Sequence, residues 1–137
     1  MKLSYPYTVE PQEGGGYLVQ FVDIEEAFTE GETMEEAAFN AAEVLTALLA
    51  YRLEKGAQIP EPSEVDGLPL ASPSAAVQSA ILVHYARGNR PMSELARALE
   101  TSWPAAQRLE NPRHWPTLKQ LDRAAKMLGK RLVLSLE

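Results

Sequence analysis

The sequence predicts an α+β fold, with a small antiparallel sheet in its first half and helices in its second half. Residues 3–10 are rich in Tyr, Thr and Val, and a glycine-rich turn separates them from a second predicted strand at 17–24, which is typical of a β-hairpin. Residues 33–36, with the sequence TMEE, form a capping box that precedes apolar residues at helical spacing. Residues 73–128 carry helical patterns almost throughout.

The first half is expected to contain three strands followed by one long helix. Pro6 lies in the first strand, and because proline has no amide donor it indicates an edge position or a strand start. A short connection with the sequence PQEGGG leads to the second strand, and a third strand should end at Gly31. The helix begins at the capping box and continues to about Lys55, before Gly56, so that its apolar face can cover one side of the sheet.

The second half is expected to be an all-α bundle with a terminal strand. The proline-rich segment 59–72 lacks periodicity and predicts an extended linker, with one short strand near 68–70. The chain therefore divides into a domain at 1–58, this linker, and a domain at 73–137. Residues 131–136, with the sequence RLVLSL, alternate with leucine at every second position and predict the terminal strand. Helices are expected at 73–87, 93–99, 103–110 and 117–128.

The formal net charge of −6 hides a division between the two halves of the chain. Residues 1–72 contain three basic and fourteen acidic side chains, a charge of −11. Residues 73–137 contain ten basic and five acidic side chains, a charge of +5. An acidic half and a basic half in one chain indicate two partners of opposite charge.

The composition also excludes several classes of protein. Without cysteine the chain can form neither disulfides nor a thiolate metal site. No apolar run reaches the roughly 20 residues needed to cross a bilayer, and the start lacks the apolar core of a secretory signal. We therefore expect a cytoplasmic protein with no membrane partner.

Catalytic chemistry is not expected either. The two histidines, His84 and His114, stand in different segments and in no metal-ligand spacing, and no nucleophile accompanies a base. Asp23 and Glu25 alternate along a strand end, as metal-binding carboxylates can, but acids at such a junction more often form an exposed or partner-facing edge. We expect no enzyme, no metal and no cofactor.

Residues 94–112, with the sequence ELARALETSWPAAQRLENP, predict two short helices joined by a tight turn. Leu95 and Leu99 would lie on the buried face of the first helix, and Ala106 and Leu109 on that of the second. This arrangement is the outline of a helix-turn-helix DNA reader.

The outer face of the second helix carries side chains that suit contacts with DNA. Glutamine and arginine can bind adenine and guanine edges in the major groove, and basic residues near loop ends can hold phosphates. Ser93 and Ser102 are expected to cap the two helices. The candidate DNA-binding residues are Arg90, Ser93, Ser102, Trp103, Gln107, Arg108, Arg113 and Lys119.

The longer pattern ELARALETS…AQRLENP…PTLKQLDRAAKMLG resembles the Cro/phage-repressor-like helix-turn-helix family. It departs from that family at Glu100, where glycine is usual in the turn, and at Ala106, where a larger aliphatic residue is common. The resemblance implies binding to operator DNA, and the alternative is a plain helical bundle with a basic surface. Because such readers generally act as dimers, we expect a homodimer or higher oligomer formed through the segments 117–128 and 131–136.

Residues 5–56 contain the motif GGY…F.DI…T.G.T..EA..NA, and through it they resemble the HicB antitoxin family. The resemblance implies a partial RNase H-like domain without its chemistry, which would bind a HicA-type toxin and block its active site. That toxin would be a small basic RNA-cleaving protein with a double-stranded-RNA-binding fold and a catalytic histidine. The matching residues are Tyr7, Val9, Gly15, Gly16, Tyr17, Val19, Phe21, Asp23, Ile24, Thr29, Gly31, Thr33, Glu36, Ala37, Asn40, Ala41 and Leu45.

The acidic charge of the first half suits such a partner, because it would attract a basic RNA-binding protein and imitate phosphate. The expected function is that of an antitoxin which inhibits its toxin and represses its own operon. The alternative is a stand-alone transcription regulator whose acidic domain senses a signal or oligomerises. The candidate toxin-binding residues are Asp23, Glu25, Glu26 and Glu30.

Overall fold

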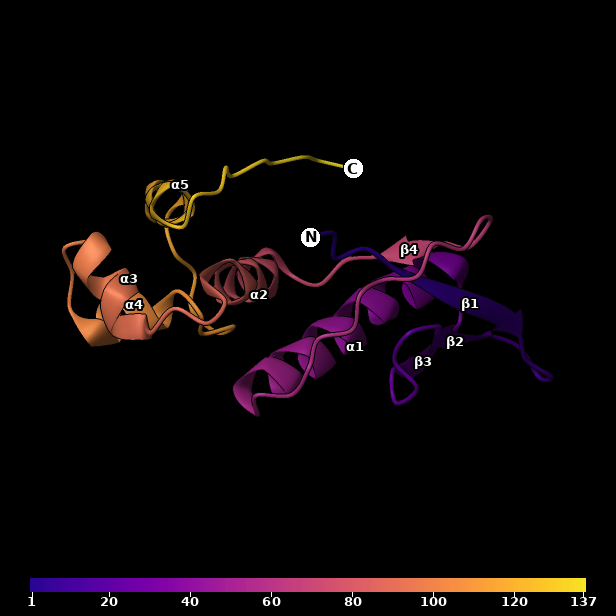
Figure 1. Cartoon of the computed structure of the whole chain (residues 1–137). Coiled ribbons are helices and arrows are strands. Elements are labelled where there is room, and N and C mark those ends of the chain that lie inside the picture. Colours follow the sequence, from indigo (N-terminus) through magenta and orange to yellow (C-terminus); the bar gives the residue numbers. More distant parts are fainter. The chain divides into compact units, whose positions relative to one another are not determined.

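The computed structural model describes all of residues 1–137 and divides the chain into two units, Met1–Ser74 and Ala75–Glu137 (Figure 1). The first unit contains β1 (Tyr5–Pro11), β2 (Tyr17–Phe21), β3 (Phe28–Gly31), α1 (Met34–Glu54) and β4 (Leu70–Ala71). The second contains α2 (Ala75–Arg87), α3 (Met92–Ala98), α4 (Trp103–Arg108) and α5 (Leu118–Met127). The predicted α+β class is thereby confirmed.

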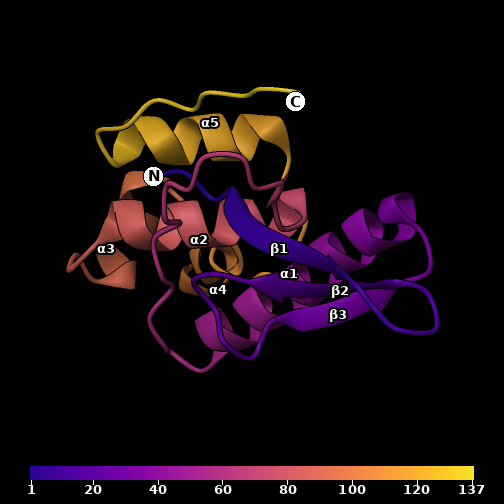
Figure 2. The ribbon, with the colours of Figure 1, turned by 90° about the vertical axis from the view of Figure 1, so that its right-hand side faces the viewer.

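The first unit is an antiparallel sheet, in the order β3-β2-β1-β4, with α1 packed on one of its faces (Figure 2). The register pairs Tyr7 with Phe21 and Val9 with Val19, and the alternation of a strand places these side chains on the same face. Val19 and Phe21 are almost fully buried, so this face is the one that meets the helix. The buried residues of α1 are Ala37, Ala41, Leu45, Leu49 and Ala50.

The start of α1 lies so close to β3 that only glycine fits at the end of the strand. A Cβ atom at Gly31 would lie 2.4 Å from the backbone nitrogen of Ala37. Thr33 caps the helix, because its side chain accepts a hydrogen bond from the backbone N–H of Glu36. The glycine of the sequence motif and the predicted cap therefore both serve to dock this helix on the sheet.

The second strand ends earlier than expected, at Phe21 instead of residue 24. The side-chain amide of Gln20 donates hydrogen bonds to the carbonyl groups of Phe21, Glu25 and Ala27. These bonds curl the chain after Phe21 into a loop, because they satisfy carbonyls that an extended strand would present to a neighbour.

The segment 59–72 is extended, as expected, but it is attached along the first unit. Ile59 is buried, and the hydroxyl group of Tyr5 donates a hydrogen bond of 2.6 Å to the carbonyl oxygen of Pro60. Further along, Ala71 of the short strand β4 pairs with Tyr5 of β1. Contacts with the first strand thus hold both ends of this segment.

The second unit packs four helices around an apolar core, in which the predicted residues Leu95, Leu99, Ala106 and Leu109 are buried. A capping box starts α5, where Thr117 and Gln120 exchange side-chain and backbone hydrogen bonds. No helix of the chain combines the length and apolar character that a membrane span requires. The full core consists of Val83, Leu95, Ala96, Leu99, Ala106, Leu109, Ala124 and Leu128.

Two local predictions in this unit are wrong. Ser93 does not cap α3, because the helix already begins at Met92 and its N-cap position is Pro91, without a side-chain hydrogen bond. No strand forms at 131–136, where the backbone has no regular structure. A strand needs the backbone of a neighbouring strand as its hydrogen-bond partner, and this segment pairs with none in the chain.

Candidate functional site

The structure separates the four candidate acids of the first unit into two pairs. Asp23 is bound internally, because its carboxylate accepts hydrogen bonds from the backbone N–H of Ser63, at 2.9 Å, and from the Ser63 hydroxyl. Glu26 forms an ion pair of 2.5 Å with Arg52, and the hydrogen bond from this guanidinium lowers the pKa of Glu26. Both residues thus tie the loop after β2 to other parts of the unit.

Glu25 and Glu30 remain exposed, and their carboxylates form no ion pair within the chain. The backbone of Glu30 is nevertheless well held, since its carbonyl accepts a hydrogen bond of 2.8 Å from the side chain of Asn40. Glu30 therefore presents an exposed carboxylate on a backbone that α1 holds in place, and Glu25 presents one from the loop after β2.

The face of the sheet opposite α1 carries a patch that the sequence reasoning missed. The register of β1, β2 and β3 aligns Glu10, Leu18 and Glu30 in one row across the strands. The next row contains Gln20 and Phe28. Leu18, which lies between Glu10 and Glu30, is 38% exposed, and Phe28 in the next row is 58% exposed, so two apolar side chains are uncovered on this face. Alternation within each strand predicts which side chains share a face, but only the register shows which residues of different strands are neighbours on it.

In the second unit, α3 and α4 form a helix pair joined by a tight turn. Glu100 in this turn has a φ of 53°, the left-handed region that favours glycine. Ser102 caps α4 by accepting a hydrogen bond from the backbone N–H of Ala105, as predicted. The pair contributes its apolar sides to the core of the unit and leaves one side of α4 in solvent.

The exposed side of α4 brings several candidate DNA-binding residues together. Trp103, the first residue of the helix, is 48% exposed, and Gln107 and Arg108 are exposed one turn further along. Arg113 is exposed in the loop after α4, and Lys119 is exposed in the first turn of α5. The remaining serine candidate, at position 93, is exposed in the first turn of α3.

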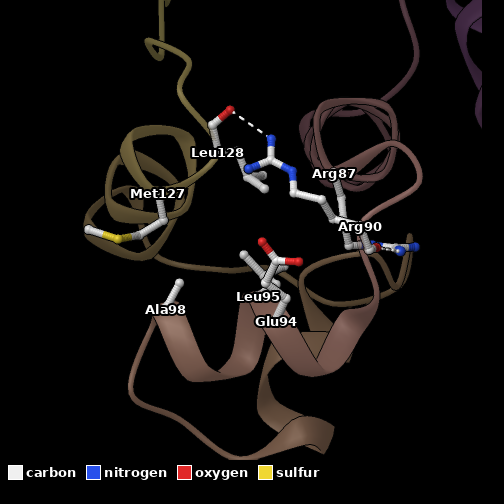
Figure 3. A pocket seen from close by; sticks show the side chains of 7 residues that line it. All are labelled: Arg87, Arg90, Glu94, Leu95, Ala98, Met127 and Leu128. Atoms are coloured by element: carbon white, nitrogen blue, oxygen red, sulfur yellow. Dashed lines mark hydrogen bonds between the residues drawn. The ribbon is translucent and has the colours of Figure 1, made fainter.

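Arg90 differs from the other candidates because it is half-buried and bound to the protein itself. Its guanidinium donates a hydrogen bond of 3.1 Å to the carbonyl oxygen of Leu128, at the end of α5 (Figure 3). It lines a shallow pocket with residues of α3 and α5, among them Glu94 and Met127. A phosphate contact at Arg90 would compete with this bond.

A charged cluster inside the second unit was also missed by the sequence reasoning. Glu110 lies two residues beyond the end of α4, and its side chain is only 9% exposed. Its carboxylate lies 2.5 Å from Nε of Arg87 and 2.6 Å from Nδ1 of His84, both on α2. Burial raises the pKa of Glu110, but the hydrogen bonds from Arg87 and His84 outweigh this effect and leave the pKa below its usual range. The cluster fastens the segment after α4 to α2.

The two units carry exposed charges of opposite sign, as expected of a protein with two binding surfaces. A family model described as the HicB-like antitoxin of bacterial toxin–antitoxin systems matches residues 4–86. The chain belongs to this family.

Three relatives agree with this assignment over nearly their whole length. Antitoxin HicB of Escherichia coli (strain K12) is 35% identical, over 96% of this chain and 98% of the relative. Antitoxin HicB 1 of Photorhabdus laumondii is 33% identical, over 98% of this chain and 88% of the relative. Antitoxin HicB 2 of the same organism is 32% identical, over 96% of this chain and 95% of the relative. These proteins are named as antitoxins and not as enzymes, which agrees with the expectation of a non-enzymatic protein.

Proposed function

We propose that the chain is the cytoplasmic antitoxin of a type II toxin–antitoxin pair and that it has two binding activities. The first unit binds and inhibits a HicA-like toxin that cleaves mRNA, and the second unit binds the operator DNA of its own operon. The observation that carries this proposal is the division of charge, −11 on the first unit and +5 on the second, in a chain of the HicB-like antitoxin family. A basic RNA-binding toxin and a polyanionic operator each match one of these charges.

The second unit would bind DNA as a helix-turn-helix formed by α3 and α4. Gln107 and Arg108 would then face base edges in the major groove, with Trp103 beside them, while Arg113 and Lys119 contact phosphates. The exposure of these five side chains and the cap at the start of α4 support this assignment.

Operator binding would require a dimer, because a single half-site provides little specificity. The tail supports dimerisation, since Val133, Leu134 and Leu136 are largely exposed in an alternating segment whose backbone lacks a strand partner. Pairing the tails of two copies would satisfy both backbones and cover these side chains. Two recognition helices would then enter successive major grooves about 34 Å apart.

The two activities can be tested separately in the full chain. Reversing the charges of Glu25 and Glu30 to lysine should slow toxin capture, and it should flatten the fall of the association rate with salt, because steering depends on these charges. Gln107→Ala should weaken operator binding by roughly 1–3 kcal/mol and relax its specificity. Lys119→Ala should weaken all DNA sequences alike and reduce the salt slope by about one.

Growth rescue of cells that express the toxin separates the two units. Gln107→Ala and Lys119→Ala should rescue growth like the wild type, and the charge reversals at Glu25 and Glu30 should rescue it less well. If the DNA-binding variants lose rescue while the acidic variants keep it, the assignment of the units is reversed. A chain that binds operator DNA but no toxin would instead be a stand-alone transcription regulator.

A further inference from the structure

We propose that the uncovered face of the sheet is the surface that seats the basic toxin, with Leu18 and Phe28 as its apolar anchors. Glu10 and Glu30, on either side of Leu18, would meet basic side chains of the toxin. This inference rests on the proposed function and goes beyond it by naming the docking face and its anchors. It also moves the expected contact away from two of the four candidate acids, Asp23 and Glu26, which are bound internally.

The register places the two anchors close to one another. Leu18 is paired with Glu30, and Gln20 with Phe28, so Leu18 and Phe28 are diagonal neighbours on adjacent strands. Diagonal neighbours have Cα atoms about 7–8 Å apart, within reach of an aromatic side chain. A partner can therefore cover both with one apolar contact, as in the centre of many protein interfaces.

The support of this patch is rigid, which lowers the entropic cost of binding. Phe28 and Leu18 belong to strands that pair on the sheet, and the opposite face of these strands packs on α1. Asn40 of that helix also holds the carbonyl of Glu30. The patch is thus preorganised in the free chain and needs no rearrangement to accept a partner.

The charges select the kind of partner. Glu10 and Glu30 stand on either side of Leu18 in the same row, and the unit as a whole carries −11. A nucleic acid would be repelled by these carboxylates. A second copy of the same face would bring acids against acids, because a two-fold interface pairs a surface with itself. A basic protein surface with an apolar centre is the partner that both the charges and the anchors fit.

A second exposed aromatic side chain provides the matched control. Phe39 lies on the outer side of α1 and is 65% exposed, so it resembles Phe28 in type and exposure. Its neighbours one turn away include Glu35 and Glu43, so it is surrounded by acids as well. It has no large apolar neighbour at helical spacing comparable with Leu18 and therefore offers no paired anchor.

The test measures binding of the full chain to the HicA-like toxin of the same operon, purified in a catalytically inactive form. Phe28→Glu and Leu18→Glu should each raise the Kd at least about 30-fold, as expected for central anchors. Phe39→Glu should leave the Kd within about threefold of the wild type, because exposed residues outside the contact contribute little. Glu10→Gln and Glu30→Gln should mainly lower the association rate at low salt. Circular dichroism and the Tm of each variant report whether the fold is kept, and Leu18→Ala provides a milder change should Leu18→Glu disturb the sheet.

The outcomes distinguish this inference from the proposed function. If the wild type binds the toxin and only Phe39→Glu weakens the complex, the docking face lies on α1 and this inference fails while the proposed function stands. If Phe28→Glu changes the oligomeric state of the antitoxin alone, measured by light scattering, but leaves toxin binding unchanged, the face binds a second copy of the chain and the inference is again overturned. If the wild type binds no toxin at all, both fail.

Discussion

Replacing Glu100 with glycine should stabilise the second unit, because Glu100 is the one non-glycine residue of the chain with a positive φ. A side chain in the left-handed region costs about 1–2 kcal/mol, which glycine avoids. Glycine in turn lowers the free energy of unfolding by roughly 0.5–1 kcal/mol, because it has greater conformational freedom in the unfolded chain. The carboxylate lies 3.7 Å from Arg123 with both side chains at least half exposed, so little is lost with this ion pair. The expected net gain is about 0.5–1 kcal/mol.

Calorimetry of the full chain should show this gain as a rise of about 2–8 °C in the Tm of the second unit. Glu100→Ala is the matched control, because it removes the same charge and ion pair but keeps a Cβ at the positive φ. If alanine raises the Tm as much as glycine does, the gain comes from removing the charge, and the argument from backbone strain is refuted. Both variants should bind operator DNA more tightly, since each removes a negative charge from the turn before α4.

Three further results are expected. Glu110→Gln should destabilise the second unit by about 3 kcal/mol at pH 7 in urea unfolding, because it leaves the largely buried Arg87 without its charged partner. Folding lowers the pKa of Glu110, so the stability that its ionised carboxylate contributes is fully present above the pKa that Glu110 has in the unfolded chain, and it is lost as the pH falls through the folded pKa. If wild type and Glu110→Gln still differ in unfolding free energy in strong acid, the difference does not come from the ionised carboxylate. Gly31→Ala should cost the first unit about 3 kcal/mol, the upper end of the usual cost of overpacking, because its Cβ would lie 2.4 Å from the backbone of Ala37, and an unchanged Tm would show that the helix can move away. If the proposed dimer forms through the tail, deleting residues 131–137 should leave a monomer in light scattering and abolish operator binding, whereas a truncated chain that stays dimeric with full affinity would exclude the tail as the interface.

Local features of the sequence predicted most elements of the fold. The glycines at 14–16 all adopt positive φ in the turn between the first two strands, and Thr33 and Ser102 cap helices as expected. The buried face of α3, with Leu95 and Leu99, follows from helical spacing alone. Turn chemistry, caps and periodicity involve residues a few positions apart, so they can be read without knowing which segments meet. The charge division and the family motif are likewise properties of the sequence.

Tertiary contacts decided which charged side chains are available for binding. Asp23 meets Ser63, Glu26 meets Arg52, and Glu110 meets Arg87 on another helix, each across more than twenty positions of the chain. No local pattern encodes such a pairing, because it depends on how the elements pack.

The same holds for the candidate docking face and for the end of the chain. Leu18 and Phe28 become neighbours only through the register of β2 and β3, and a shift by one residue would turn each strand's side chains to the opposite face. The alternating tail at 131–136 has the composition of a strand, yet it forms none in the single chain. A strand exists only where a second backbone supplies the complementary donors and acceptors, and composition cannot provide that partner.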